Sequence, residues 1–140
     1  MQLEKVKTVN DTTVYCNKFG KNKNIYFYVN ENKGTVVCKK INCKQDVTDL
    51  MYNAGLRAVD ESFKLKDFYL KEEYIGKAKC HFEDKFDLNT GIEIAQQKML
   101  QKYYNDKTVA LGNALIALDF AKEELYHHWF KSLEKLGQKE

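Results

Sequence analysis

The side chains that could do chemistry are few, and most of them lie in one short stretch of the sequence. Cys80 and His81 are neighbours, and the acidic residues Glu83, Asp84 and Asp87 follow them. A thiol beside an imidazole can make a nucleophile, and carboxylates can serve as a general acid and base. Adjacent strand residues point to opposite faces, so Cys80 and His81 alone make a poor catalytic dyad. A polar turn that caps a helix explains the acidic residues equally well.

Metal and cofactor motifs are missing from the sequence. The four cysteines contain no Cys-x-x-Cys pair, and the three histidines supply no zinc spacing; His127 and His128 fit the surface or interface of a helix. There is no phosphate-binding Gly-rich loop and no His-Glu-x-x-His. We therefore expect no catalytic residue, no metal, no cofactor and no enzymatic activity.

A stronger pattern runs from Gly76 to Gly91. A strand with one face of small residues ends at Phe82, whose ring could stack on a base. A helix begins shortly afterwards, and its first N–H groups could bind phosphate or ribose oxygens at Asn89, Thr90 and Gly91. Arg57, the only arginine, would bind a phosphate through two hydrogen bonds if it folds nearby. These features predict a nucleotide pocket without a catalyst; the alternative is that the small residues let a helix pack closely and Phe82 belongs to the core.

These residues need a sheet to position them. β-Branched and aromatic runs at 12–16, 25–29 and 35–41 alternate with turn-like segments and predict an antiparallel meander. Residues 68–75 and 74–82 also have the composition of strands, and the second of these alternates between two faces. One face carries small and aromatic residues, and the other carries Ile75, Lys77, Lys79 and His81.

Two other segments have apolar residues at the spacing of a helix rather than of a strand. Val47, Leu50 and Met51 have helical spacing in an otherwise ambiguous segment. Thr90 with Glu93 fits a capping box, with Asp87 as a competing cap, and predicts a helix to about residue 104. We expect Asn105-Asp106 to break it and a second helix, about 45 Å long, to end at Gly137.

Strands followed by helices indicate an α+β fold, with an N-terminal antiparallel sheet packed against two C-terminal helices. The length of 140 residues fits a single domain over 1–140, with a sheet region at 1–83 and a helical region at 88–137.

The second helix is apolar on more sides than one sheet can cover. A four-three spacing joins Leu111, Leu115, Leu118, Leu125, Trp129 and Leu136, with interruptions at Lys122 and Ser132. Another stripe contains Val109, Ile116 and Phe120. We expect this helix to form a homodimer or higher homo-oligomer; the alternative is burial between the sheet and the first helix.

The net charge and the hydropathy limit the kinds of binding partner and the cellular compartment that we expect. The net charge of +3 is too small to mark a dedicated nucleic-acid binder, so we expect no nucleic-acid partner. The charge is nevertheless uneven, since residues 1–46 hold nine lysines against four acids. No apolar run approaches a membrane span and the N-terminus lacks a signal peptide, so we expect a cytoplasmic protein with reduced thiols.

The run GKAKCHFEDKFDLNTGIEIAQQKMLQKYY, with Arg57 upstream and a long C-terminal helix, resembles the first family of phage Thoeris anti-defence proteins. The resemblance implies a homo-oligomeric sponge in the host bacterial cytoplasm. It would bind glycocyclic ADP-ribose, a cyclic ADP-ribose isomer made by TIR-domain enzymes, without cleaving it. Some members of the family also bind cyclic trinucleotides.

The resemblance also implies site residues. Arg57, Cys80 and Phe82 match pocket residues of the family, and Asn89 falls where a polar contact is expected. The long helix of the family offers cationic residues to the pocket of the neighbouring subunit. Here that region has only Lys107 and the neutral Asn113, which is a departure from the family's pattern.

Two other classes of function remain open. One is a small nucleotide-hydrolysing enzyme that uses Glu83, Asp84 or Asp87. The other is a nucleic-acid-binding regulator that uses the basic N-terminal half of the chain.

Overall fold

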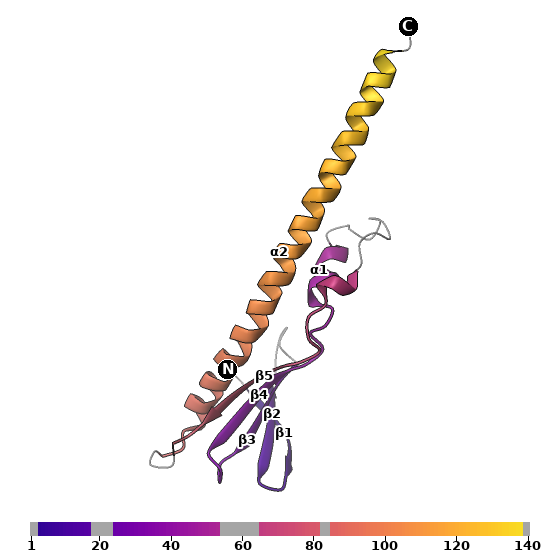
Figure 1. Ribbon diagram of the computed structural model, residues 1–140. Helices are drawn as coiled ribbons and strands as arrows, with labels where there is room; N and C mark the ends of the chain where they lie inside the picture. Colours follow the sequence, from indigo (N-terminus) through magenta and orange to yellow (C-terminus); the bar gives the residue numbers. More distant parts are fainter. Residues whose placement is uncertain (1–2, 18–23, 54–64, 82–84, 139–140) are drawn as a thin grey trace.

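The computed structural model describes residues 3–17, 24–53, 65–81 and 85–138, and it places a long helix across one face of an antiparallel sheet (Figure 1). The sheet has five strands in chain order: β1 (Leu3–Val9), β2 (Thr12–Asn17), β3 (Ile25–Asn30), β4 (Thr35–Lys40) and β5 (Tyr74–Lys79). Between β4 and β5 lie the helix α1 (Asp46–Asn53) and the 3-10 helix η2 (Leu65–Phe68). The helix α2 (Leu88–Gly137) follows β5, so the α+β fold with a long second helix is confirmed.

The meander forms where the sequence predicts it. The runs at 12–16, 25–29 and 35–41 are β2, β3 and β4. The turn before β2 contains Asn10 with φ of 55°, and the turn before β4 contains Gly34 with φ of 64°. Asn and Gly tolerate this left-handed conformation better than other residues, so these two positions allow tight connections.

The strands alternate between two faces, and α2 covers one of them. Phe27 on β3, Cys38 on β4 and Gly76 on β5 lie in one row across this inner face, and all three are buried. A Cβ atom on Gly76 would collide with the Ala95 carbonyl oxygen and the Met99 backbone nitrogen. The backbone of α2 therefore lies directly against the backbone of β5.

The buried side of α2 follows the predicted stripe. Ile92, Ala95, Met99 and Tyr103 are buried in the core, as their spacing predicts. The last buried residue of the helix is Ala114. Because α2 has 50 residues, it is about 75 Å long at ~1.5 Å per residue, and its C-terminal part extends well past the sheet (Figure 1).

Two helix boundaries differ from the prediction. Asn105 and Asp106 do not break the helix, so the two helices expected between residues 90 and 136 are one. A polar residue lowers helix propensity by less than ~1 kcal/mol, and the Asp106 carboxylate accepts a 2.7 Å hydrogen bond from the Tyr74 hydroxyl. The N-cap is Asp87 rather than Thr90, and the Thr90 hydroxyl donates to Asp87.

The sheet also differs from the prediction in two places. Residues 68–73 are not a strand: Phe68 ends η2, and the Leu70 N–H donates to the Lys44 carbonyl, which holds this segment beside α1. The edge strand β1 was not predicted. Its residues are mostly exposed, so the sequence has no apolar alternation there. The helical spacing of Val47 and Met51 does correspond to α1, where both are buried.

Gly76→Ala should lower the stability of the fold, because the new methyl group meets helix backbone that cannot rotate away. Overpacking of this kind costs roughly 1–3 kcal/mol or more. Thermal unfolding followed by circular dichroism measures the change. Gly112→Ala is the matched control: nothing lies within 4 Å of its Cβ position, so this variant should gain roughly 0.5–1 kcal/mol of stability. Equal melting temperatures for the two variants would contradict the close helix–strand packing.

Candidate ligand-binding site

Residues 78–81 and 85–91 form one side of a hollow at the start of α2. The hollow has a volume of about 430 Å³ and lies between the turn before β4, the end of β5 and the first turns of α2. Its walls are formed by Gly34, Val36, Ala78, Lys79, Cys80, His81, Lys85, Phe86, Asp87, Thr90, Gly91 and Ile94. A second hollow of about 590 Å³ adjoins it, shares Gly34 and Cys80, and is also lined by Lys33 and Glu31.

Three of the predicted ligand-binding residues meet in this hollow: Cys80, Thr90 and Gly91. Asn89 is exposed on the first turn of α2, next to this wall. Arg57 and Phe82 lie outside the described residues.

Lys107 and Asn113 lie elsewhere on α2. Lys107 is 17 residues beyond Thr90, about 25 Å along the helix axis. Asn113 is exposed still further along, at the point where the helix leaves the sheet. Within one chain, neither residue reaches the hollow at the helix start.

The helix start at the hollow is occupied by its own cap. The Asp87 carboxylate accepts hydrogen bonds from the Asn89 N–H at 3.2 Å and from the Thr90 hydroxyl at 2.6 Å. The Gly91 N–H donates to the Asp87 carbonyl at 3.0 Å. A carboxylate at this position already complements the positive end of the helix dipole, so an anionic ligand would have to rely on other groups nearby.

Those other groups are lysines that the sequence reasoning did not select. Lys33, Lys79 and Lys85 surround the two adjoining hollows, and among the described residues the carboxylates that line the hollows are Glu31 and Asp87. Lys79 and Lys85 belong to the segment between Gly76 and Gly91, whereas Lys33 comes from the turn before β4, so no single local motif contains all three. Together they make the rim weakly positive, which suits a ligand with phosphate groups.

Gly34 fixes the back of the hollow. The Cys80 N–H donates to the Gly34 carbonyl at 2.7 Å, and a Cβ on Gly34 would lie 3.1 Å from the Cys80 Cβ. The Cys80 thiol donates to the carbonyl of His81 at 3.4 Å. The thiol therefore lies against the backbone at the end of β5.

A second polar site, which the sequence reasoning missed, joins α1 to α2. Lys40 is only 8% exposed; its ammonium donates to the Asn24 side-chain oxygen at 3.2 Å and lies 5.0 Å above the Tyr103 ring. The Tyr103 hydroxyl donates to the Asp46 carboxylate, and the Lys107 ammonium lies 5.5 Å from the centre of the Tyr103 ring. Burial and Asp46 together raise the pKa of Tyr103, and burial raises the pKa of Tyr74 to about 12. These hydroxyls stay protonated and act as structural hydrogen-bond donors. In the sequence, the one feature that could have indicated this polar site is Lys40, a lysine at a buried position of the alternating strand β4.

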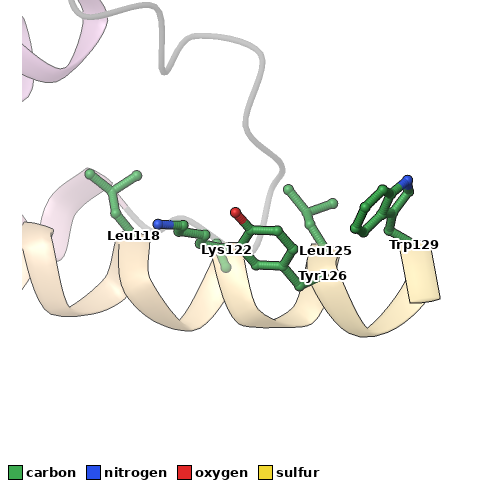
Figure 2. Close-up of a pocket in the computed structure, with 6 residues that line it drawn as sticks. Leu118, Lys122, Leu125, Tyr126 and Trp129 are labelled. Carbon is green, nitrogen blue, oxygen red and sulfur yellow. The ribbon is translucent and has the colours of Figure 1, made fainter. Parts of the chain in front are cut away.

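The C-terminal part of α2 carries an open apolar groove. Figure 2 shows Leu118, Lys122, Leu125, Tyr126 and Trp129 projecting from the same side of the helix. With Ala121 they line a groove of about 550 Å³, and the Lys122 ammonium lies 5.7 Å from the centre of the Tyr126 ring. The apolar side chains are strongly exposed, at 71% for Leu125 and 72% for the nearby Phe120.

Among residues 3–17, 24–53, 65–81 and 85–138, no group of three or more histidine, cysteine or acidic side chains is placed to hold a metal ion. In the same ranges, no helix combines the length and the apolar character of a membrane span. Comparison of the chain with protein-family models, curated proteins and solved structures gives no match.

The four thiols should differ in reactivity. Burial raises the pKa of Cys38 to about 12 and that of Cys43 to about 11, and the thiolate is the reactive form. Iodoacetamide at pH 8 should modify the half-exposed Cys16 and Cys80 and leave Cys38 and Cys43 unmodified until the protein unfolds. Peptide mass mapping counts the modified sites. Rapid modification of Cys38 in the folded protein would show that β4 is not buried under α2.

Proposed function

We propose that the protein binds and sequesters a cyclic ADP-ribose isomer, glycocyclic ADP-ribose, in the hollow at the start of α2. In this proposal it is a phage anti-defence protein of the host bacterial cytoplasm that blocks Thoeris immunity by holding the signal uncleaved. The observation that carries the proposal is the meeting of Cys80, Thr90 and Gly91 with the lysines of one hollow.

The dimensions and chemistry of the hollow support a ligand of this class. Small-molecule pockets commonly measure 300–1,000 Å³, and the hollow of about 430 Å³ opens into a second one of about 590 Å³. Phe86 offers an aromatic wall for a base, while Lys33, Lys79 and Lys85 can neutralise a diphosphate. Because Asp87 occupies the helix start, we assign the phosphate contacts to these lysines rather than to the first N–H groups of α2.

Sequestration is favoured over hydrolysis by the bonding of Asp87. Both of its carboxylate oxygens accept hydrogen bonds from the first turn of α2. To act as a general base, Asp87 would have to give up these bonds and leave the helix without its cap. The enzyme alternative would then depend on Glu83 and Asp84, which lie outside the described residues.

We also propose that the protein is a homodimer or higher oligomer through the C-terminal part of α2. The helix exposes Leu115, Leu125, Trp129 and Leu136, with the half-buried Leu118, along the four-three spacing on which coiled coils depend. Monomeric proteins rarely expose an apolar surface of this extent. The expectation that Lys107 and Asn113 contact the ligand of a neighbouring subunit stays a prediction of the family resemblance.

The ligand proposal predicts that charge reversal at the rim weakens binding. Lys33→Glu and Lys85→Glu should each raise the Kd for glycocyclic ADP-ribose roughly tenfold or more, because each removes a charge-assisted contact. Calorimetric titration measures the affinity. Lys71→Glu is the matched control, since this exposed lysine lies outside both hollows and its loss should leave the Kd unchanged.

The complex of the protein with glycocyclic ADP-ribose also distinguishes the candidate functions. Heat denaturation of the complex should release the ligand intact, as chromatography and mass spectrometry would show. Release of a cleaved product would favour the enzyme alternative. If the parent protein does not bind the ligand at all, both the sponge and the hydrolase are wrong.

The assembly proposal predicts that two charges in the groove dissociate the oligomer. Leu118→Glu combined with Leu125→Glu should reduce the mass measured by light scattering to that of a monomer, because each change buries an unpaired carboxylate. Glu134→Lys lies on the opposite side of α2 and should leave the mass unchanged. A parent protein that is already monomeric at micromolar concentration would exclude this interface.

A further inference from the structure

We propose that the outer face of the sheet, opposite α2, binds single-stranded nucleic acid. This surface shares only Lys79 with the lining of the hollow, and the inference does not depend on the function proposed for the hollow. The overall net charge of +3 argues against a dedicated nucleic-acid binder, but the sheet gathers lysines from distant segments onto one surface.

The strand register defines this surface. Tyr28 on β3 pairs with Val37 on β4, which pairs with Lys77 on β5. In the next row, Tyr26 pairs with Lys39, which pairs with Ile75. Paired residues of an antiparallel sheet lie on the same face, so these side chains form one continuous surface.

Two further lysines extend the surface to its edges. Lys7 on β1 pairs with Val14, which pairs with Tyr28, and Lys79 on β5 pairs with Thr35. The described elements that pack on the sheet lie elsewhere: α2 covers the opposite face, where it contacts Gly76 (Figure 1). The residues of the outer face are half-buried or exposed along β3, β4 and β5, whereas Val14 on β2 is buried between Lys7 and Tyr28.

The charge on this surface is positive but not uniform. Lys7, Lys39, Lys77 and Lys79 contribute four positive charges, and Glu4 and Glu73 are the nearby carboxylates. Glu73 lies 3.8 Å from the Lys39 ammonium, and both side chains are partly exposed. Exposed pairs of this kind are weak, so a phosphate group can compete for Lys39.

The aromatic residues favour a single strand over a duplex. Tyr26 and Tyr28 lie two residues apart on the central strand, so their Cα atoms are about 7 Å apart. Bases in a duplex strand are stacked at ~3.4 Å and offer no free faces, whereas an extended single strand presents separated bases. The lysines can neutralise the phosphates of the nucleic acid, and the two half-buried tyrosine rings can stack on its bases. Proteins that bind single strands without sequence preference combine these two kinds of contact. The Lys39 ammonium lies 5.6 Å from the Tyr28 ring and can contact the phosphate beside a stacked base.

The test is fluorescence anisotropy with a labelled 15-nucleotide oligo(dT) and with a duplex of equal length. We expect the full chain to bind the single strand more tightly than the duplex at 50 mM salt. Tyr26→Ala and Tyr28→Ala should each weaken binding roughly tenfold or more, and Tyr28→Phe should bind like the parent because the ring is kept.

The lysines are tested through the dependence of affinity on salt. Lys77→Gln should reduce the slope of log K against log salt by about 0.7, the value for one phosphate contact of a single strand. Lys77 is chosen because it does not line the hollow, whereas Lys79 does. Lys131→Gln, on the free part of α2, is the matched control and should leave the slope unchanged.

Three results would overturn the proposal. They are no binding of oligo(dT) at low salt, duplex binding as tight as single-strand binding, and unchanged affinity in both alanine variants with native circular dichroism spectra. The second and third would indicate general attraction of polyanions rather than a stacking surface. Loss of single-strand binding together with unchanged binding of glycocyclic ADP-ribose would confirm that the two sites are independent.

Discussion

The close contact of α2 with β5 is the constraint on which the rest of the structure depends. Gly76 allows the backbone of the helix to approach the backbone of the strand at Ala95 and Met99, and this contact sets the height of α2 above the sheet. At one end of the contact, the space between helix and sheet opens into the hollow beside Cys80 and Thr90. Toward the other end, the same helix carries Tyr103 to the Asp46 carboxylate and closes the core over α1. Both polar sites of the inner side thus depend on one packing distance.

The parts of the fold with strong periodicity could be predicted from the sequence. The alternation from Tyr74 onward identified β5 and its buried face, and the spacing of Ile92 and Met99 identified the buried side of α2. The continuity of α2 could not be predicted in the same way. Asn105 and Asp106 favour a break locally, but the Tyr74 hydroxyl bonds to Asp106 across the core, and this tertiary contact is invisible in a sequence window. The strand β1 was missed because an exposed edge strand needs no apolar alternation.

The candidate site was only partly predictable for the same reason. Cys80, Thr90 and Gly91 belong to one segment, and their meeting in a hollow follows from a strand, a turn and a helix in succession. Lys33 joins them only because the turn before β4 lies beside the end of β5, which depends on sheet order. The expectation that Lys107 contacts the ligand of a neighbouring subunit stays a prediction; within one chain its ammonium lies 5.5 Å from the centre of the Tyr103 ring. The lysines of the outer face also depend on sheet order. The net charge of the whole chain does not show that the sheet places several lysines on the same face.

The free part of α2 has a consequence for the lifetime of the protein. Beyond Ala114 no residue of the helix is buried, so a single copy supports more than 20 residues of helix by its own hydrogen bonds alone. A helical segment without buried contacts frays from its free end, and the opened backbone is accessible to a protease. In the proposed oligomer, a partner over the apolar groove would make this opening less frequent. Degradation would then remove newly made, solitary chains first and spare those already assembled, so that abundance would rise steeply once synthesis passes the association threshold.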